Sequence, residues 1–317
     1  MQLRKICLIG GTGFVGGNLA TELARRGYAL KILTRRRERN RDMLVFPRID
    51  LVETDVHYVS NLTEAIGDCD AVINTVGVLN PEGDSTFSQV HAELPGKIAE
   101  ACEYHRISRI IHVSALGAAE DAPSEYLRTK WAGEQSLLST ASRTADVSIF
   151  RPAVIFGPGD SFFNRFAQIL ALKPLVFPLA SPGTRLQPVF VGDVTQAICD
   201  ALENRSTFGN TYELAGPDAF TLRELVEYTA RLTGVSTRIW ELPTGLAQLQ
   251  ARVFERLPGK PFSTDNLRSL SVDNVSQKNA LGEFNITPTG IDAVVPGYLG
   301  QARKSARYQV FRRTAGR

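Results

Sequence analysis

Short apolar runs alternate with amphipathic segments over the first 150 residues of the chain. The runs lie at 5–10, 29–35, 49–55, 70–77, 106–115 and 146–152. Most of them, such as "KICLIG" and "DAVINTVG", lack alternation of apolar and polar positions, which is typical of parallel strands buried on both faces. The segments at 16–28, 59–69, 89–105 and 124–140 carry apolar residues at helical spacing. This order predicts βαβ units and an α/β fold with a doubly wound parallel sheet.

The regular alternation weakens after Pro152. Residues 155–190 are rich in proline and phenylalanine, which fits irregular backbone lining an apolar pocket and equally a plain hydrophobic core. "TYELAG" (211–216) predicts one more strand, and 221–234 predicts an amphipathic helix with Thr221 as N-cap and Gly234 at its end. We expect a core of residues 1–153 with returning segments at about 186–216, a smaller lobe of 154–185 and 217–300, and a basic tail at 301–317.

Composition narrows the class of protein. The chain has 317 residues, 43% of them hydrophobic and 22% charged, as in ordinary soluble globular proteins. Its formal net charge of +3 is too small to indicate a nucleic-acid partner. No uncharged apolar run approaches the roughly 20 residues of a membrane span, and "ICLIG" is too short for a signal peptide. We expect a cytoplasmic protein whose cysteines are buried, reduced thiols without a metal (Cys7, Cys69, Cys102 and Cys199).

A glycine-rich loop follows the first predicted strand. "CLIGGTGFVGGNLA" contains Gly10-x-x-Gly13-x-x-Gly16 between a strand and a helix. In this context one glycine permits a tight turn, one lets the backbone approach a pyrophosphate, and one lets helix and strand pack closely. The helix N-terminus then offers free N–H groups to the phosphates. The loop predicts nucleotide binding.

The end of the second strand bears on the choice of dinucleotide. An NAD site usually has an acidic residue there, whereas this chain has Thr34 and Arg35 in "ILTRRRER". A guanidinium can bind a 2′-phosphate through two parallel hydrogen bonds. We therefore expect NADP(H) in preference to NAD(H), with Arg35 reading the 2′-phosphate and the arginines at 36, 37, 39 and 41 in a solvated loop.

These motifs together resemble the short-chain dehydrogenase/reductase superfamily in its extended or atypical branch. The likeness rests on the glycine loop, "ETDV" with Asp55, "NTVG" at 74–77, Tyr126-x-x-x-Lys130, "RPAVIFGPGD" at 151–160 and "PVFVGDV" at 188–194. It covers about residues 5–300. Within the superfamily, "HVSALGA", "YLRTKWAGE", "QPVFVGDV" and "SVDNVSQ…FNITPTGID" are similar to the NADPH-binding accessory subunits of respiratory complex I and their bacterial relatives.

The resemblance implies a Rossmann fold and assigns the site. Tyr126 and Lys130 share one helical face, and in the family the lysine holds the nicotinamide ribose and lowers the tyrosine pKa. Ser114, at the end of the fifth strand, is the candidate for positioning a substrate oxygen, although Ala115 and Leu116 stand where further hydroxyls would be expected. The cofactor-binding residues so assigned are Gly10, Thr12, Gly13, Phe14, Val15, Gly16, Arg35, Asp55, Val56, Val76, Gly77, Lys130, Pro152 and Val154.

Three functions remain open. The first is an NADP(H)-holding subunit or assembly-type factor. The second is an NADPH-dependent reductase of an apolar carbonyl or quinone-like substrate that uses Tyr126, Lys130 and Ser114. The third is a sugar-nucleotide epimerase or dehydratase, which Leu186 disfavours because the family's diphosphate-binding arginine aligns there. The tail, with Arg303, Lys304, Arg307, Arg312, Arg313 and Arg317, is either solvated or attaches the protein to a respiratory complex or the inner face of a membrane.

Overall fold

The computed structural model describes residues 3–81, 86–141, 145–256 and 262–299, and the chain divides into two compact units. Unit 1 contains Met1–Pro152, Gly192–Leu214 and Gln277–Ile286, and unit 2 contains Ala153–Val191, Ala215–Ser276 and Thr287–Arg317. The segment 277–286, which the sequence placed in the smaller lobe, groups with unit 1 because Phe284 packs against Phe150 and Tyr212 there. The predicted basic tail lies outside the described residues.

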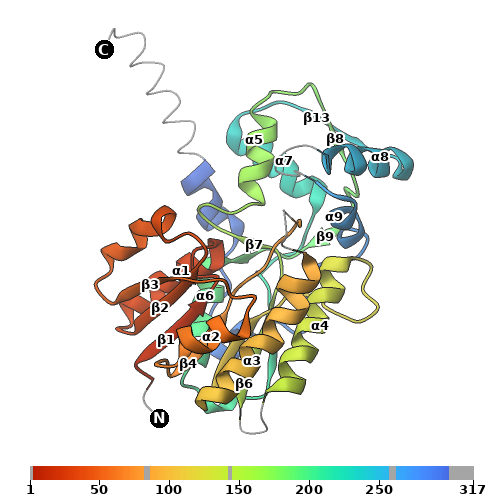
Figure 1. The fold of residues 1–317 in the computed structure, drawn as a ribbon. Coiled ribbons are helices and arrows are strands. Elements are labelled where there is room, and N and C mark those ends of the chain that lie inside the picture. Colours follow the sequence, from red (N-terminus) through yellow and green to blue (C-terminus); the bar gives the residue numbers. More distant parts are fainter. Residues whose placement is uncertain (1–2, 82–85, 142–144, 257–261, 300–317) are drawn as a thin grey trace. The chain divides into compact units, whose positions relative to one another are not determined.

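Unit 1 is built on a seven-stranded parallel sheet in the order β11-β6-β5-β4-β1-β2-β3 (Figure 1). Its strands are β1 (Lys5–Ile9), β2 (Ala29–Thr34), β3 (Ile49–Glu53), β4 (Ala71–Asn74), β5 (Arg109–Val113), β6 (Asp146–Pro152) and β11 (Thr211–Leu214). The predicted doubly wound fold is confirmed. β1 pairs with both β2 and β4, so the strand order reverses there, and in open α/β sheets ligands bind outside the carboxyl ends of the strands at such a point.

Helices α1 (Phe14–Arg25), α2 (Val59–Ile66), α3 (Leu94–His105), α4 (Glu125–Thr140) and α6 (Val191–Ala201) accompany this sheet, with short helices η1 (Arg37–Val45), η3 (Arg205–Thr207) and η4 (Ala280–Phe284). The predicted helix at 89–105 is divided: a π-helical turn, η2 (Ser88–Glu93), precedes α3. Pro95 explains the wide turn, because it has no N–H for the carbonyl of His91 four residues earlier. The arginines at 36, 37, 39 and 41 are exposed as predicted, but η1 includes most of the expected loop.

Apolar side chains of α2, α3 and the sheet form the core of unit 1. All four cysteines are buried and free, as predicted. Three of them, Cys7, Cys69 and Cys102, belong to this core. Burial raises the pKa of the Cys102 thiol to about 12, so it stays protonated near neutral pH. These thiols are packing groups.

Unit 2 contains three two-stranded sheets, β7 (Ile155–Phe156) with β10 (Val189–Phe190), β9 (Arg185–Leu186) with β12 (Phe220–Thr221), and β8 (Val176–Leu179) with β13 (Arg238–Glu241). Its helices are α5 (Phe163–Leu170), α7 (Leu222–Thr233), α8 (Thr244–Phe254) and α9 (Thr264–Ser269), followed by a helical segment at 291–299. Phe156, Phe163 and Phe177 are buried in one cluster with α7, so the phenylalanine-rich segment forms a hydrophobic core. In the part of the chain that the structure describes, no helix is long and apolar enough to cross a membrane.

Candidate functional site

The glycine loop joins β1 to α1 in a backbone conformation that excludes side chains. Gly10 has φ +81°, and the N–H of Gly13 donates to its carbonyl at 3.0 Å. A Cβ on Gly10 would lie 2.9 Å from the nitrogen of Val76, and one on Gly16 would lie 2.2 Å from the oxygen of Gly10. Among the described residues, no side chain caps α1 and its first turn holds no acidic residue. The helix N-terminus therefore keeps free N–H groups for an anion.

The other predicted loop residues lie around this turn. Thr12 is exposed, while Phe14 and Val15 are half-buried in the first turn of α1. Arg35 is exposed directly after β2. The preceding Thr34 is buried, and its hydroxyl accepts from the backbone nitrogen of Arg36 at 3.3 Å. The carboxyl end of β2 thus presents a guanidinium, and the nearby Glu53 carboxylate, which comes from β3, accepts from the backbone nitrogen of Arg37 at 2.8 Å.

Asp55 and Val56 follow β3. Asp55 is exposed, and its carboxylate accepts from the backbone nitrogen of His57 at 3.0 Å. Val56 is buried in the core. The resemblance assigns both residues to cofactor binding.

Lys130 is buried on α4 between the loops that follow β4 and β5. Its Nζ donates to the carbonyls of Val76 (3.2 Å) and Val113 (3.1 Å). A Cβ on Gly77 would lie 3.2 Å from this Nζ, so glycine gives the ammonium room. Burial lowers the pKa of Lys130 to about 8. An ammonium has three N–H groups, and the two carbonyl bonds leave one for a ligand.

Tyr126 lies one helical turn before Lys130, as predicted. Its ring packs edge-on against His91 (centroids 5.3 Å apart) and Phe87 (6.2 Å). Burial raises the pKa of the Tyr126 hydroxyl to about 12. Ser114 follows β5, and its buried Oγ has no hydrogen-bond partner among the described residues.

Two histidines and an asparagine complete this region, and sequence reasoning missed them. Val78 N donates to His91 Nε2 at 3.0 Å, and His91 Nδ1 lies 3.2 Å from the Thr129 hydroxyl. Asn74 Nδ2 donates to His112 Nδ1 at 3.1 Å. Burial, and then the nearby Lys130 charge, lower the pKa of both imidazoles, so both are neutral near pH 7. The sequence signals were the position of His112 two residues before Ser114 and that of Asn74 at the start of the motif at 74–77.

The remaining predicted residues, Pro152 and Val154, lie in different units. Pro152 ends β6 in unit 1, and its carbonyl accepts from Leu116 N at 2.9 Å. Val154 belongs to unit 2, where its nitrogen donates to Asn274 Oδ1 at 2.9 Å. The other predicted site residues all lie in unit 1, at the ends of its strands or on α1 and α4. Their roles toward a cofactor stay predictions.

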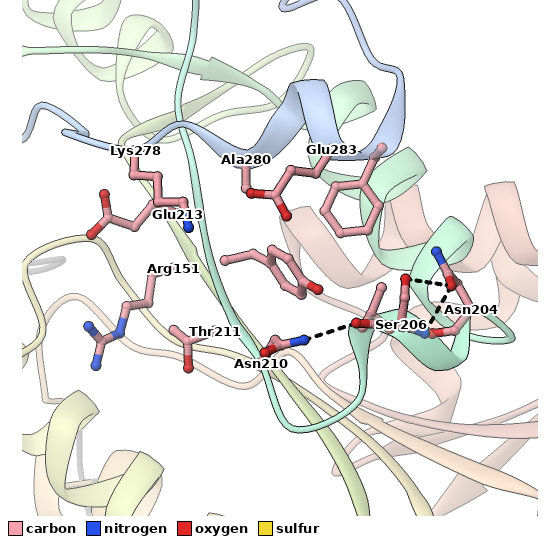
Figure 2. A pocket seen from close by; sticks show the side chains of 12 residues that line it. Arg151, Asn204, Ser206, Asn210, Thr211, Glu213, Lys278, Ala280 and Glu283 are labelled. Carbon is pink, nitrogen blue, oxygen red and sulfur yellow. Dashed lines mark hydrogen bonds between the residues drawn. The ribbon is translucent and has the colours of Figure 1, made fainter.

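A separate depression of about 500 Å³ lies at the β11 edge of unit 1 (Figure 2). Residues of β6, β11, the 204–210 turn and 278–284 line it. Arg151, on its rim, binds the buried carboxylate of Glu134 through Nε (2.9 Å) and a terminal nitrogen (2.5 Å). None of the predicted site residues lines this depression.

Comparison with known proteins agrees with the geometry. Residues 10–152 match a family described as NAD(P)H-binding. The chain is 29% identical over 315 residues to the mitochondrial NADH dehydrogenase [ubiquinone] 1 alpha subcomplex subunit 9 of Arabidopsis thaliana, covering 94% of this chain and 77% of that protein. It is 29% identical over 248 residues to the ceramide reductase of Caulobacter vibrioides, covering 75% of this chain and 73% of that protein.

The fold is shared with solved structures. A nucleoside-diphosphate-sugar epimerase from Staphylococcus aureus superposes with a TM-score of 0.72 at 16% identity, covering 93% of this chain and 99% of that one. Residues 10–152 therefore form an NAD(P)-binding domain. Over most of its length the chain is similar to the mitochondrial NADH dehydrogenase [ubiquinone] 1 alpha subcomplex subunit 9 of several organisms.

Proposed function

We propose that this protein holds NADP(H) tightly and serves as a subunit or assembly-type factor rather than as a catalyst. The observation that carries the proposal is the contrast between Lys130 and Tyr126. The lysine is fixed by two carbonyls with one N–H left for a ribose hydroxyl. The tyrosine has a pKa of about 12, whereas an acid/base catalyst works best with a pKa near the operating pH.

Arg35 supports NADP(H) as the nucleotide. The exposed guanidinium follows β2, where NAD sites usually have a carboxylate. A 2′-phosphate would gain a charge-assisted hydrogen bond there. The name of the Arabidopsis relative states that it is a subunit of an NADH dehydrogenase [ubiquinone] 1 alpha subcomplex, and an equivalent assembly partner is part of the present proposal.

Purification followed by mass spectrometry of the extracted nucleotide tests the proposal. We expect the wild-type protein to retain NADP(H), which exchanges with free nucleotide over hours and stays unoxidised. Lys130→Ala should lose the nucleotide because the ribose contact is gone. Lys97→Ala, on the surface of α3 and paired with Glu93, is the matched control and should retain it. A wild-type protein without nucleotide, or with exchange in seconds, would contradict the holder function.

A second candidate is an NADPH-dependent reductase of an apolar carbonyl or quinone-like substrate. Ser114 favours it, since a buried hydroxyl without a partner is costly unless a ligand atom completes its hydrogen bonding. The ceramide reductase relative is named for a reduction. If this candidate is right, NADPH oxidation depends on added substrate and Tyr126→Phe abolishes it while nucleotide affinity is kept. Full turnover by Tyr126→Phe would end the acid/base assignment.

A further inference from the structure

Unit 2 exposes a group of large apolar side chains, here called the apolar face: Leu172, Leu175, Val176, Trp240, Leu246, Leu249 and Val253. Leu172 and Leu175 are 82% and 87% exposed. In unit 1, the described exposed apolar residues are scattered over separate elements, which is usual for a soluble protein. Those of the apolar face come from one sheet and the two segments that adjoin it.

The sheet part of the apolar face follows from strand alternation. In β8, Phe177 and Leu179 are buried, while Val176 and Pro178 are exposed. Val176 pairs with Arg238 and Pro178 with Trp240 in β13. Paired residues of neighbouring strands share one side of the sheet. The outer side of β8 and β13 therefore presents an apolar surface that includes an indole.

The turn before β8 carries the two most exposed leucines. Lys173 N donates to the carbonyl of Leu170 at 2.8 Å, and Lys173 adopts a left-handed φ of +51°. Arg238 N donates to the carbonyl of Leu175 at 3.0 Å. Both leucines thus stand on a hydrogen-bonded turn that is tied to β13. Their exposure is a property of the folded backbone.

Helix α8 has its larger apolar side chains exposed to solvent. Ala247 and Ala251 are buried, whereas Leu246, Leu249 and Val253 are exposed at i, i+3 and i+7. A surface helix of a globular protein normally buries its large apolar stripe. The short segment that joins β13 to α8 is held to β8, because Leu242 N donates to the carbonyl of Leu179 at 3.0 Å.

Cations outnumber anions around the apolar face. Over 171–180 and 238–256 the sequence holds four basic residues (Lys173, Arg238, Arg252 and Arg256) and two acidic ones (Glu241 and Glu255). All four basic residues are exposed. Glu255 accepts from the nitrogen and the hydroxyl of Thr264, each at 2.6 Å, so its carboxylate is engaged within unit 2. The surroundings are therefore basic.

We propose that the apolar face docks on an anionic lipid bilayer. Exposed leucines and a tryptophan with lysine and arginine beside them match the acyl and headgroup layers of such a surface. Bilayer docking is independent of the nucleotide site, and vesicle binding is measured apart from nucleotide retention. Either function can therefore fail without the other.

The first experiment measures co-sedimentation of the full chain with vesicles of phosphatidylglycerol and phosphatidylcholine. Leu246→Gln combined with Leu249→Gln, and separately Leu172→Gln combined with Leu175→Gln, should weaken binding about tenfold or more, since each leucine loses apolar burial. Leu138→Gln is the matched control: Leu138 is 47% exposed on α4, against 44% for Leu246, and this variant should bind like wild type. Thermal melts confirm that every variant is folded.

The second experiment follows Trp240 in the bilayer. The chain has two tryptophans, Trp131 and Trp240, so Trp131→Phe leaves Trp240 as the only indole. We expect its emission to shift to the blue with anionic vesicles and to be quenched by brominated lipid. Vesicles of phosphatidylcholine alone should bind more weakly and give a smaller shift.

Several results would overturn bilayer docking. Wild-type protein that does not sediment with anionic vesicles would do so, as would glutamine variants that bind as tightly as Leu138→Gln. Equal binding to neutral and anionic vesicles would remove the role of the basic residues. If wild type forms a dimer that the glutamine variants dissociate, and vesicles are not bound, the apolar face joins two copies of the chain instead.

Discussion

Lys130 is the residue on which the proposed nucleotide binding depends. Its charge is buried, and the Glu134 carboxylate, which raises the pKa of Lys130, is already bound by Arg151. Two carbonyls and neutral imidazoles surround the ammonium. A buried lysine held in this way titrates well below its ordinary pKa, at about 8.

Nucleotide affinity should therefore fall as the pH rises above about 8. The ammonium form donates to the ribose, so binding favours protonated Lys130 and raises its pKa; affinity is full below the free-protein pKa and is lost as Lys130 deprotonates. The 2′-phosphate titrates near pH 6, below this window. Titrating the fluorescence of NADPH from pH 7 to 9.5 measures the effect. Lys130→Met should bind weakly with a flat profile, and a falling profile in that variant would contradict the assignment.

Arg35 should decide the choice between the two nucleotides. Arg35→Asp should weaken NADP(H) binding by about 2–4 kcal/mol, because a charged hydrogen bond is lost and repulsion is added. NAD(H) affinity should stay the same or improve. Arg39→Asp, in the exposed part of η1, is the control and should change the ratio little. Equal losses for both nucleotides in Arg35→Asp would show that Arg35 does not read the 2′-phosphate.

At the scale of elements, the N-termini of α7 and α1 differ in their capping. The capping box of α7 is complete, with Thr221 and Glu224 bonded reciprocally and Gly234 at φ +68° after its end. The N-terminus of α1 has no such cap among the described residues. The sequence thus caps the N-terminus of α7, which packs in unit 2, and leaves the N-terminus of α1 uncapped, where we propose that the nucleotide binds.

Two adjacent glycines of α1 provide a matched test of the loop. Gly16→Ala should reduce nucleotide affinity about tenfold or more, since the new Cβ would lie 2.2 Å from the oxygen of Gly10 and the phosphate-facing turn must shift. Gly17→Ala meets its nearest atom at 3.8 Å, and should keep affinity while gaining about 0.5–1 kcal/mol of stability. Calorimetric titration and thermal melts measure both. Similar behaviour of the two variants would refute the close-approach role of Gly16.

At the scale of the whole molecule, the protein combines a nucleotide-binding unit with a second unit that we propose to be its docking part. The basic tail at 301–317 lies outside the described residues, and its attachment role stays a prediction. Its six basic residues would each contribute about 1 kcal/mol close to an anionic surface. That attraction is screened by salt, whereas apolar docking is not.

Deletion of residues 301–317 should leave the melting temperature and NADP(H) affinity unchanged, because the tail follows the last segment that resembles the family fold. Binding to anionic vesicles should fall at low salt and differ little from wild type at high salt. Co-sedimentation at two salt concentrations measures this. Identical binding at low salt with and without the tail would rule out its attachment role.

The sequence by itself determined the sheet, the glycine loop and the helical face that Tyr126 and Lys130 share, because continuous apolar runs, turn glycines and helical spacing are local properties. Thr221 and Gly234 bounded α7 correctly for the same reason. The sequence could not separate a pocket from a core at 155–190, since phenylalanine suits both.

Only the tertiary structure decided which distant groups meet. His91, which lies in a π-helical turn, accepts from the backbone nitrogen of Val78 and contacts the hydroxyl of Thr129. His112 accepts from Asn74, with which it pairs on the neighbouring strand. The pKa values of Lys130 and Tyr126 depend on burial by segments far away in the chain. The exposure of the large apolar residues of α8 could not be predicted either, because a helical apolar pattern predicts a buried face. Only the packing shows that Ala247 and Ala251 are buried instead.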